Sequence, residues 1–393
     1  MVYEARIGLS ESAKIIPMST AAPSRLLSLN SALDAWGIDA FLAWHPVTMG
    51  YLHNVHEGAI EGFMALGLHR DGRSAIICPS LSATQAARAG IKDIRSWRDG
   101  EDPLALFMQL AEEWNLKSAI IAVEDEMPAH MLLAMQMALP AALFRTGGEI
   151  LGSLMRVKAE DELNLMRRAA RIADEAYVSL LGSVKAGLTE RKVDHILRNE
   201  MARLGEEPTF CIIAAGANGA EPHHLSDDTV LTEGDVVIMD FGCHVEGYQS
   251  DVTRTIAIGS ASDEAKKVYR IVYDAHMAGR RAIGPSVPAE HIDAAAREVI
   301  AGAGYGEYFM HRLGHGIGRK GHEEPFIIAG NASPVEVGHC FSIEPGIYLP
   351  GKFGVRIENI EFRGARVSDI NGAGIRFEKG SLSVVRCAFF DNE

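Results

Sequence analysis

Between residues 25 and 144, short apolar runs alternate with stretches in which apolar residues recur every three or four positions. The apolar runs are FLAW at 41–44, FMALGL at 62–67, SAIIC at 74–78 and SAIIAVE at 118–124. They have the length of buried strands, whereas PLALFMQLAEEW and PAHMLLAMQMAL have the spacing of amphipathic helices. This alternation predicts an α/β domain over residues 25–150, preceded by an N-terminal arm over 1–24.

From residue 155 onward the pattern changes to a plan that occurs twice. Helical spacing over 161–182 is followed by a second helix that Thr189 caps and Gly205 closes, and then by strand-like segments. The same order returns with helices over 263–282 and 290–302 and with further strands. The duplication predicts an α+β domain with pseudo-twofold symmetry over residues 155–363.

The last stretch of the chain, residues 364–393, has a different character. Short β-type runs are separated there by Asn-Gly and Lys-Gly turns. We therefore expect an atypical β-rich tail that is not part of the preceding domain.

Composition narrows the class of protein without giving a function. Hydrophobic residues make up 47% and charged residues 23% of the chain, as in ordinary globular proteins. Acidic residues outnumber basic ones by 52 to 38, a formal charge of −14 that disfavours a general nucleic-acid binder. Five scattered cysteines without a CxxC pair, and the lack of a signal-like or membrane-spanning apolar run, predict a cytoplasmic protein that does not contact membranes.

Four acidic residues lie inside otherwise apolar, strand-like segments. Asp240 ends the run in VVIMDFG, and Asp251 follows eleven residues later in GYQSDVTRT. The second half repeats this arrangement, with Glu344 in FSIEPGIY and Glu358 fourteen residues later in FGVRIENI. Carboxylates that converge in an apolar setting are costly unless a cation compensates them.

A histidine-rich and glycine-rich segment, HRLGHGIGRKGHEEP, lies between the two acidic pairs and carries His311, His315 and His322. Four carboxylates with one imidazole form an oxygen-rich set that suits two divalent cations better than a thiolate zinc site. Two such ions, about 3.5–4 Å apart, can share a water or hydroxide as nucleophile. The residues therefore indicate metal-assisted hydrolysis.

Together, and in this order, these motifs resemble the pita-bread metallopeptidases, which include methionine aminopeptidase, aminopeptidase P and prolidase. The resemblance rests on AEPHHLSDD, MDFGCHVEGYQSDVTRT, HRLGHGIGRKGHEEP, SIEPGIY and GVRIENI. Residues 25–150 resemble the N-terminal domain of the creatinase, prolidase and aminopeptidase P branch. The implied fold is an α/β N-terminal domain followed by an α+β pita-bread catalytic domain.

The resemblance also implies a metal-ligand set. Asp240 would chelate one metal ion, His315 and Glu344 would bind the other, and Asp251 and Glu358 would bridge the two. Mn²⁺ is the expected metal, with Co²⁺, Zn²⁺ and Fe²⁺ as alternatives that cellular supply decides between. Because all five ligand types are present, the resemblance argues against the metal-free creatinase activity.

Further roles follow from the same resemblance. His223 and His322 would contact the substrate and its developing oxyanion, and Glu344 would act as general base. Independently of the resemblance, Arg356 lies two residues before Glu358 and thus on the same strand face, where it would bind a substrate carboxylate or support the metal carboxylates, or form a structural ion pair. His53 and His56 are weaker candidates for lining the cleft.

The implied activity is hydrolysis of the bond between an N-terminal residue and proline in a small peptide, by an enzyme that relatives suggest is a homodimer. Dipeptidase and aminopeptidase forms are both open. Two alternatives remain: a same-fold enzyme on a non-peptide substrate, such as a dimethylsulfoniopropionate lyase or an amidine or ectoine-type hydrolase, and a catalytically silent peptide-binding module. Arg319 and Gly321 depart from the apolar and β-branched residues usual in prolidase-like proteins, which predicts an altered substrate preference.

Overall fold

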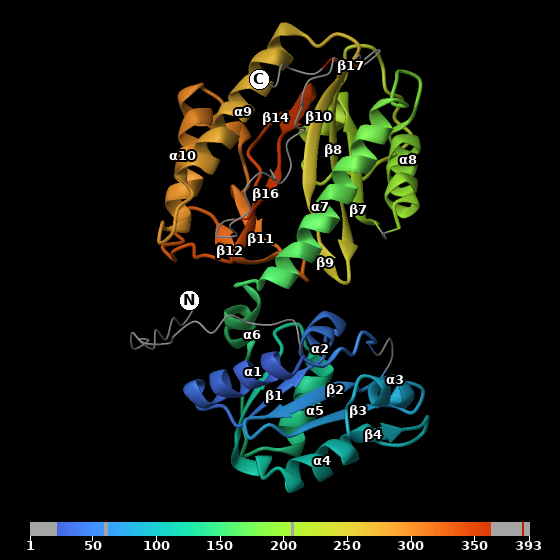
Figure 1. Cartoon of the computed structure of the whole chain (residues 1–393), viewed down its shortest axis with the longest axis vertical. Helices are drawn as coiled ribbons and strands as arrows, with labels where there is room; N and C mark the ends of the chain where they lie inside the picture. Colours follow the sequence, from blue (N-terminus) through green and yellow to red (C-terminus); the bar gives the residue numbers. More distant parts are fainter. Residues whose placement is uncertain (1–21, 59–61, 206–207, 363–386, 389–393) are drawn as a thin grey trace.

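The N-terminal domain is built on a mixed sheet in which both faces are covered by helices. The computed structural model describes residues 22–58, 62–205, 208–362 and 387–388 (Figure 1). The strands of this sheet are β1 (Ala40–Ala43), β2 (Ala65–His69), β3 (Ser74–Pro79), β4 (Asp93–Trp97), β5 (Ile120–Val123) and β6 (Leu143–Thr146), in the order β4-β3-β2-β1-β5-β6. Strand β2 pairs antiparallel with β1 and β3, and the other neighbours are parallel.

Alternate residues of the central strand β1 enter two separate cores. Phe41 packs with helices on one face, and Leu42 packs with helices on the other. The helices are α1 (Ala22–Trp36), α2 (Pro46–His53), α3 (Ala83–Arg88), α4 (Pro103–Glu113), α5 (Ala129–Ala138) and α6 (Gly148–Met155), with a short 3-10 turn, η1 (Leu116–Ser118). Burial on both faces explains why the sequences of β1, β2, β3 and β5 are mainly apolar rather than alternating, whereas the edge strands β4 and β6 carry polar residues.

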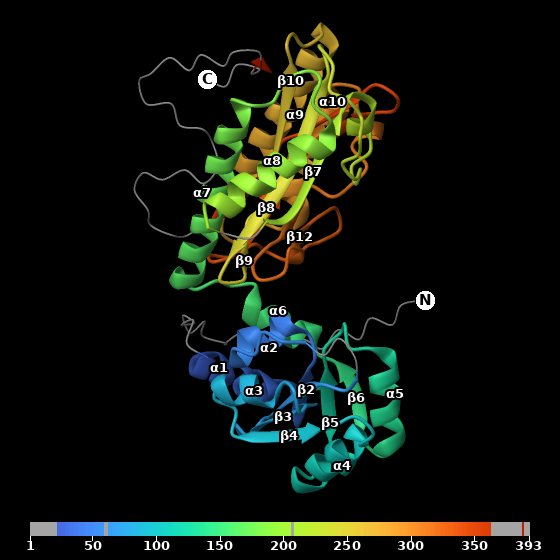
Figure 2. The same ribbon diagram turned by 90° about the vertical axis from the view of Figure 1, so that its right-hand side faces the viewer.

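The first half of the C-terminal domain places two helices against an antiparallel sheet. Its elements are α7 (Glu160–Leu181), α8 (Glu190–Arg203), β7 (Pro208–Ala215), η2 (Gly216–Ala220), β8 (Val236–Val245), β9 (Tyr248–Gln249) and β10 (Val252–Ile258). Strand β8 pairs with β7 on one side and β10 on the other. The apolar faces of α7 and α8 close the core over this sheet (Figure 2).

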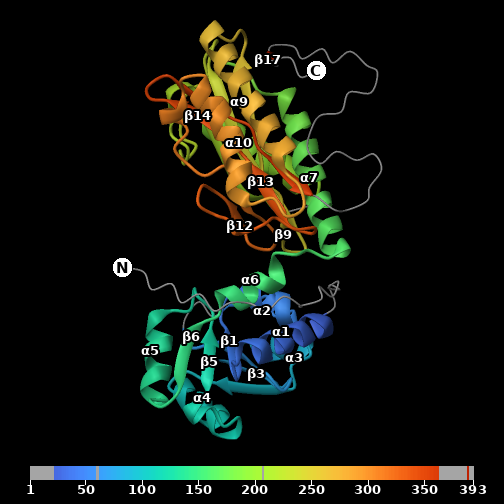
Figure 3. The same ribbon diagram turned by 90° about the vertical axis from the view of Figure 1, so that its left-hand side faces the viewer.

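The second half repeats the order of helix, helix and strands. Its elements are α9 (Asp263–Ala282), α10 (Ala289–Gly302), η3 (Gly306–Tyr308), β11 (Gly314–Gly316), β12 (Glu323–Ile327), β13 (Cys340–Ile343), β14 (Gly346–Leu349), β15 (Phe353–Arg356) and β16 (Asn359–Phe362). A four-stranded sheet in the order β12-β11-β13-β16 packs against α9 and α10 (Figure 3). The four predicted helices of this domain are confirmed to within a few residues.

The two halves meet between β10 and the chain around residue 358. Thr253 and Glu358 form an isolated antiparallel bridge, with the Glu358 amide donating to the Thr253 carbonyl at 3.2 Å. Close by, the Thr255 hydroxyl donates to the carbonyl of Arg356 at 2.7 Å. We call this contact the seam, because it joins strands from the two halves of the domain.

A buried polar cluster joins the N-terminal domain to the C-terminal one. The Arg25 guanidinium donates to the Tyr51 carbonyl at 2.9 Å, to Glu162 of α7 at 3.1 Å and to the Tyr248 hydroxyl at 3.0 Å. The Tyr51 hydroxyl donates to the Leu154 carbonyl at 3.0 Å. The cluster therefore connects α1 and α2 to the start of the C-terminal domain.

The predicted N-terminal arm and β-rich tail fall largely outside the described residues. Residues 22–24 belong to α1, and residues 387–388 form a short strand, β17 (Cys387–Ala388), paired antiparallel with the edge strand β10. Within the ranges that the structure describes, no helix combines the length and the apolar character that crossing a bilayer requires.

Candidate metal centre

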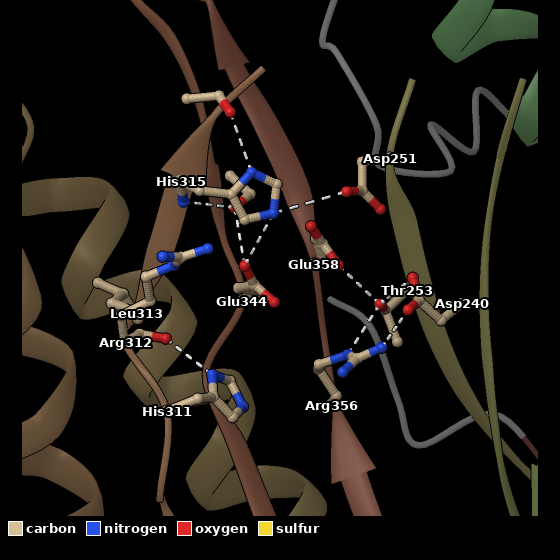
Figure 4. Close-up of polar contacts among 12 residues, drawn as sticks. Asp240, Asp251, Thr253, His311, Arg312, Leu313, His315, Glu344, Arg356 and Glu358 are labelled. Atoms are coloured by element: carbon tan, nitrogen blue, oxygen red, sulfur yellow. Dashed lines mark hydrogen bonds and ion pairs between the residues drawn. The ribbon is translucent and has the colours of Figure 1, made fainter. Parts of the chain in front are cut away.

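Three side chains from both halves of the domain converge on one buried point beside the seam. Asp251 precedes β10, His315 is the middle residue of β11, and Glu358 forms the bridge with Thr253. One ligand atom of each lies within 4.8 Å of those of the other two, and all three residues are less than 10% exposed (Figure 4). The seam therefore brings together residues that are more than one hundred positions apart in the chain.

Glu344 completes this group from the second half. It follows β13 directly, and its Oε1 lies 3.3 Å from Nε2 of His315. The hydroxyl of Ser342 donates to the same Oε1 at 3.0 Å, and it also accepts the backbone amide of His315 at 3.0 Å. Ser342 thus connects the backbone of His315 to the carboxylate of Glu344.

The tautomer of His315 follows from its backbone contact. Nδ1 lies 3.0 Å from the carbonyl of Gly316 and therefore carries the proton. The lone pair of Nε2 is left facing the carboxylates of Glu344 and Asp251, the latter at 3.7 Å. Three electron-rich atoms that face one another require a proton or a cation between them.

Asp240 lies on β8, next to this group, and its carboxylate is held by two partners. One oxygen accepts the hydroxyl of Thr253 at 3.0 Å, and the other forms an ion pair with the guanidinium of Arg356. Thr253 lies directly across from Asp240 in the ladder between β8 and β10. Asp251 is two residues before Thr253, so Asp240 and Asp251 are diagonal neighbours rather than directly opposite each other.

The pKa values of three acidic residues of the centre are raised. Burial is the largest cause that raises the pKa of Asp251 and Glu358, and repulsion among the carboxylates adds to it. Burial also raises the pKa of Glu344 to about 7, although the charge of Arg356 opposes the shift. For His315, burial and then the neighbouring His322 lower the pKa to about 3, so the imidazole is neutral at pH 7.

The residues present fit divalent cations. Asp251 Oδ1 and Glu358 Oε1 are buried without a hydrogen-bond partner, as expected of oxygens reserved for a ligand outside the polypeptide. A neutral imidazole with carboxylate oxygens is a donor set suited to Mn²⁺, Fe²⁺, Co²⁺ or Zn²⁺. The fit is most direct at Asp251, His315 and Glu358, whereas the oxygens of Asp240 are engaged by Thr253 and Arg356.

The centre opens into a pocket of about 850 Å³ that contains both histidines expected to contact the substrate. His223 and His322 line the pocket together with His315 and Glu344. The rings of His315 and His322 are in edge contact, with centroids 3.9 Å apart. Burial lowers the pKa of His322, and the charge of Arg312 adds to the effect.

The loop that carries His223 is fastened by a buried carboxylate, Glu190, at the start of α8. Its oxygens accept the backbone amide of Ala215 at 2.7 Å, the side-chain amide of Asn218 at 3.0 Å and the backbone amide of Asp227 at 3.1 Å. The ring of His224 lies 2.7 Å away. Glu190, His224 and Asp227 could geometrically surround a cation, but hydrogen bonds from the loop already use both Glu190 oxygens.

Arg356 is engaged by other residues of the protein rather than free to contact a substrate. Its side chain is buried and donates to Asp240, to the Thr253 hydroxyl at 3.1 Å and to the Tyr348 hydroxyl at 3.5 Å. These contacts disfavour the substrate contact among the alternatives that the sequence left open.

Three residues that the sequence linked to the cleft lie elsewhere. His53 is within 3.4 Å of the Ser74 hydroxyl in the N-terminal domain. His56 and Arg319 line a separate pocket at the boundary between the domains, together with Gly50 and Tyr248. Among the described residues that line the metal-centre pocket, none of the three is present.

Sequence reasoning missed several residues that shape the site. In the sequence, Thr253 and Ser342 look like ordinary strand residues, and Glu190 looks like an ordinary residue at the start of a helix. Only their positions in the structure show that they hold other residues of the site. Arg312 lies in a motif that the sequence did single out, but its neighbours there are histidines with clearer roles.

Comparisons with known proteins agree with the geometry. Residues 164–361 match the model of Metallopeptidase family M24, and residues 25–154 match the Creatinase/Prolidase N-terminal domain. The probable dipeptidase PepE of Mycobacterium tuberculosis is 38% identical over 348 residues, which cover 86% of this chain and 91% of that protein. The Xaa-Pro dipeptidase of Lactobacillus helveticus is 34% identical, covering 80% and 87%.

A solved structure shows the same similarity in three dimensions. The recombinant prolidase from Thermococcus sibiricus aligns with a TM-score of 0.84 at 33% identity, covering 87% of this chain and 94% of that one. The fold class predicted from the sequence is thereby confirmed. The centre, the fold and these matches agree with one another. The chain therefore belongs to metallopeptidase family M24 and carries the creatinase/prolidase N-terminal domain ahead of its metallopeptidase domain.

Proposed function

We propose that the protein is a metal-dependent exopeptidase that hydrolyses the bond between an N-terminal residue and proline in di- or oligopeptides. The observation that carries the proposal is the convergence of Asp251, His315 and Glu358 beside a pocket that also contains Glu344 and two further imidazoles. Relatives named Xaa-Pro dipeptidase and prolidase support the choice of substrate.

We assign the metal ligands to the five residues that the family resemblance named, with two divalent cations, preferably Mn²⁺. The ligands are Asp240, Asp251, His315, Glu344 and Glu358. When bound, the cations would polarise the scissile carbonyl and lower the pKa of a water molecule. Arg356 holds Asp240 in place and offsets part of the negative charge of the centre.

Glu344 is the residue we assign as general base. Its carboxylate, which lies 3.3 Å from Nε2 of His315, would accept a proton from the attacking water and release it again to the leaving nitrogen. The hydrogen bond from Ser342 orients the carboxylate at Oε1, which leaves Oε2 for the water. The base is therefore oriented before the substrate arrives.

His322 and His223 are assigned to the substrate carbonyl. Both line the pocket, and His322 lies against His315, next to the centre. An N–H donor there would stabilise the negative charge that develops on the carbonyl oxygen during attack. Proline gives such an enzyme a distinct substrate, because its imide nitrogen lacks the N–H that ordinary peptidases bind.

The proposal is tested with metal-stripped protein to which Mn²⁺ is returned. Release of alanine from Ala-Pro, Ala-Pro-Ala and Ala-Ala-Ala is followed by mass spectrometry, with Asp251→Asn as the control variant. We expect metal-dependent release from the two proline peptides only, lost in the variant, and two equivalents of Mn²⁺ per chain by elemental analysis. Folded, metal-loaded protein that cleaves none of the peptides would contradict the proposal and favour a non-peptide substrate or a silent binding module.

The homodimer and the cytoplasmic location stay predictions. Size-exclusion chromatography with light scattering would test the former, and fractionation of the source cells would test the latter.

A further inference from the structure

A second pocket, of about 920 Å³, lies at the boundary between the two domains and shares no lining residue with the pocket of the metal centre. Two arginines line it, and they differ in how their charge is used. Arg25 is paired with Glu162 at 3.1 Å. Arg319 forms no ion pair with a carboxylate in the described parts of the chain, and its guanidinium makes only one long hydrogen bond there, from Nη1 to the carbonyl of Glu246 at 3.4 Å. This guanidinium therefore receives no counter-charge from those residues.

Arg319 is almost wholly removed from water even though it lacks such a partner. The residue is only 9% exposed, and its Nε is buried without a hydrogen-bond partner in the part of the chain that the structure describes. Burying a charge is costly unless an opposite charge compensates it. An anion that enters the pocket would offset this cost.

Two glycines, one from each domain, make room for the guanidinium. A Cβ atom on Gly247, in the turn between β8 and β9, would lie 2.8 Å from Nη2 of Arg319, and a Cβ atom on Gly50 of α2 would lie 3.4 Å from it. The guanidinium carbon lies over the ring of Tyr248, 5.0 Å from the ring centroid. Stacking uses the flat face of a guanidinium and leaves the N–H groups along its edge available to a ligand.

The backbone that carries Arg319 is fixed by β9. The backbone amide of Gln249 donates to the carbonyl of Gly318 at 2.8 Å, and the side-chain amide of Gln249 donates to the carbonyl of Arg319 at 3.0 Å. The side chain is thus presented to the pocket from a fixed position, which lowers the entropic cost of binding a ligand there.

The other polar groups of the pocket suit an anion of small size. Nδ1 of His244 is buried without a partner among the described residues, and it can donate a hydrogen bond in one tautomer. Asn54 uses its Oδ1 for the ring of His56 at 2.8 Å, which leaves its N–H groups as donors. Two exposed carboxylates, Asp161 and Glu246, line the same pocket and would repel an extended polyanion more strongly than a small anion.

We infer that this pocket is a second binding site, which takes a small oxyanion: a phosphate or the carboxylate of a small molecule. The planar N–H edge of a guanidinium matches two oxygens of either group. The walls come from α2 in the N-terminal domain and from β9 and the segment between β11 and β12 in the C-terminal domain. A bound anion would therefore stabilise the contact between the domains. The inference does not depend on the proposed function.

The test titrates phosphate and, separately, acetate into the manganese-loaded full chain after dialysis to remove excess metal. We expect titration calorimetry to show one bound anion per chain. A saturating concentration should raise the melting temperature about 2–5 °C above its value in sodium chloride of equal ionic strength. The affinities identify the source of the oxyanion, since a phosphate site binds phosphate more tightly and a carboxylate site binds acetate more tightly.

Two substitutions of Arg319 test the contact itself. Arg319→Met should weaken binding about 10- to 100-fold, the range for a hydrogen bond to a charged group. Arg319→Lys keeps the charge but loses the fork, and should bind with intermediate affinity. Circular dichroism checks that each variant is folded.

Two control variants locate the bound anion. Lys320→Met removes the neighbouring positive charge, which pairs with Glu126 at 3.0 Å and lines a different pocket, and it should leave anion binding unchanged. Asp251→Asn changes the metal centre, and it should also leave binding at the domain boundary unchanged.

The outcomes separate this inference from the proposed function. Phosphate and acetate that give no heat of binding, and raise the melting temperature no more than sodium chloride does, would overturn the inference. Binding that Arg319→Met retains and Asp251→Asn abolishes would overturn it as well, because the anion would then lie on the metal centre. A failure to cleave any peptide contradicts the proposed function alone, because anion binding at the domain boundary uses no step of the peptidase reaction.

Discussion

The hydroxyl of Thr253 is the hydrogen-bonding centre of the seam, and Thr253→Val removes it while keeping the shape of the side chain. The oxygen lies 2.7 Å from Glu358 Oε2 and 3.0 Å from Asp240 Oδ1, and it accepts Nε of Arg356 at 3.1 Å. Thr253 is fully buried, so water cannot replace the hydroxyl in the variant.

The size of the effect follows from these contacts. The single hydroxyl proton serves one carboxylate at a time, and its loss costs about 1.5–3 kcal/mol for a hydrogen bond to a charged group. The Arg356 Nε–H loses its acceptor as well, which brings the expected loss of unfolding free energy to about 2–4 kcal/mol. Because the two carboxylates are assigned as metal ligands, we also expect Mn²⁺ affinity to fall about 10- to 100-fold.

Urea unfolding followed by circular dichroism, together with titration calorimetry for Mn²⁺, measures both effects. With a slope of about 2 kcal/mol/M, the midpoint should fall by about 1–2 M. All four tryptophans lie between residues 36 and 114, so tryptophan fluorescence reports the N-terminal domain and should shift less. Thr253→Ser keeps the hydroxyl and should retain most of the metal affinity.

A valine variant with the wild-type midpoint and wild-type Mn²⁺ affinity would refute this reasoning. It would mean that Arg356 alone organises Asp240, and that Glu358 needs no donor from the polypeptide.

Three further predictions concern the charges and the packing around the centre. Burial raises the pKa of Glu344 to about 7 and that of the other clustered carboxylates in the same direction, so in metal-free folded protein these carboxylates hold protons that they have released in the unfolded chain. The contribution of these carboxylates to stability should therefore decrease as pH rises from about 4 through 7, while His315 and the other histidines whose pKa burial lowers contribute in the opposite direction. Glu344→Gln removes one of the carboxylate contributions, so thermal melts of the metal-free variant should show stability rising more steeply with pH than in wild type. Glu190→Gln leaves one acceptor oxygen for the loop that carries His223, and we expect kcat/KM to fall about tenfold or more in peptidase assays while circular dichroism stays native. A Cβ on Gly354 would lie 1.8 Å from a backbone carbonyl of η2, so Gly354→Ala should cost about 1–3 kcal/mol or more in urea unfolding, whereas Gly302→Ala meets open space and should be tolerated.

The extent to which the sequence predicted the fold can be followed in particular elements. The helical spacing over 263–282 coincides with α9 because apolar residues at every third or fourth position face the second core. The apolar runs of the N-terminal domain were identifiable as strands because both faces of these strands are buried, so their sequences are almost entirely apolar. The relative position of the two halves was not visible in either half alone.

Some residues of the site could be predicted from the sequence, and others could not. Asp251 and Glu358 stand out in the sequence because a carboxylate inside an apolar run is costly to bury unless a cation or another partner compensates its charge. Thr253 does not stand out, since threonine is common in strands, and its role depends on a register that places it between two carboxylates. Arg319 was linked to substrate preference because it departs from the residue usual in prolidase-like proteins, yet the segment between β11 and β12 places it in the separate pocket at the domain boundary.

The seam has a consequence for how such a centre can arise and persist. Asp240 and Asp251 come from the first half, whereas His315, Glu344 and Glu358 come from the second. Neither half alone offers a cation enough donors, so a chain cut in the loop at 259–262 would yield two fragments that bind metal well only as a pair. Bound metal would then report reassembly of the fragments directly, and the two halves are constrained to evolve as complementary partners.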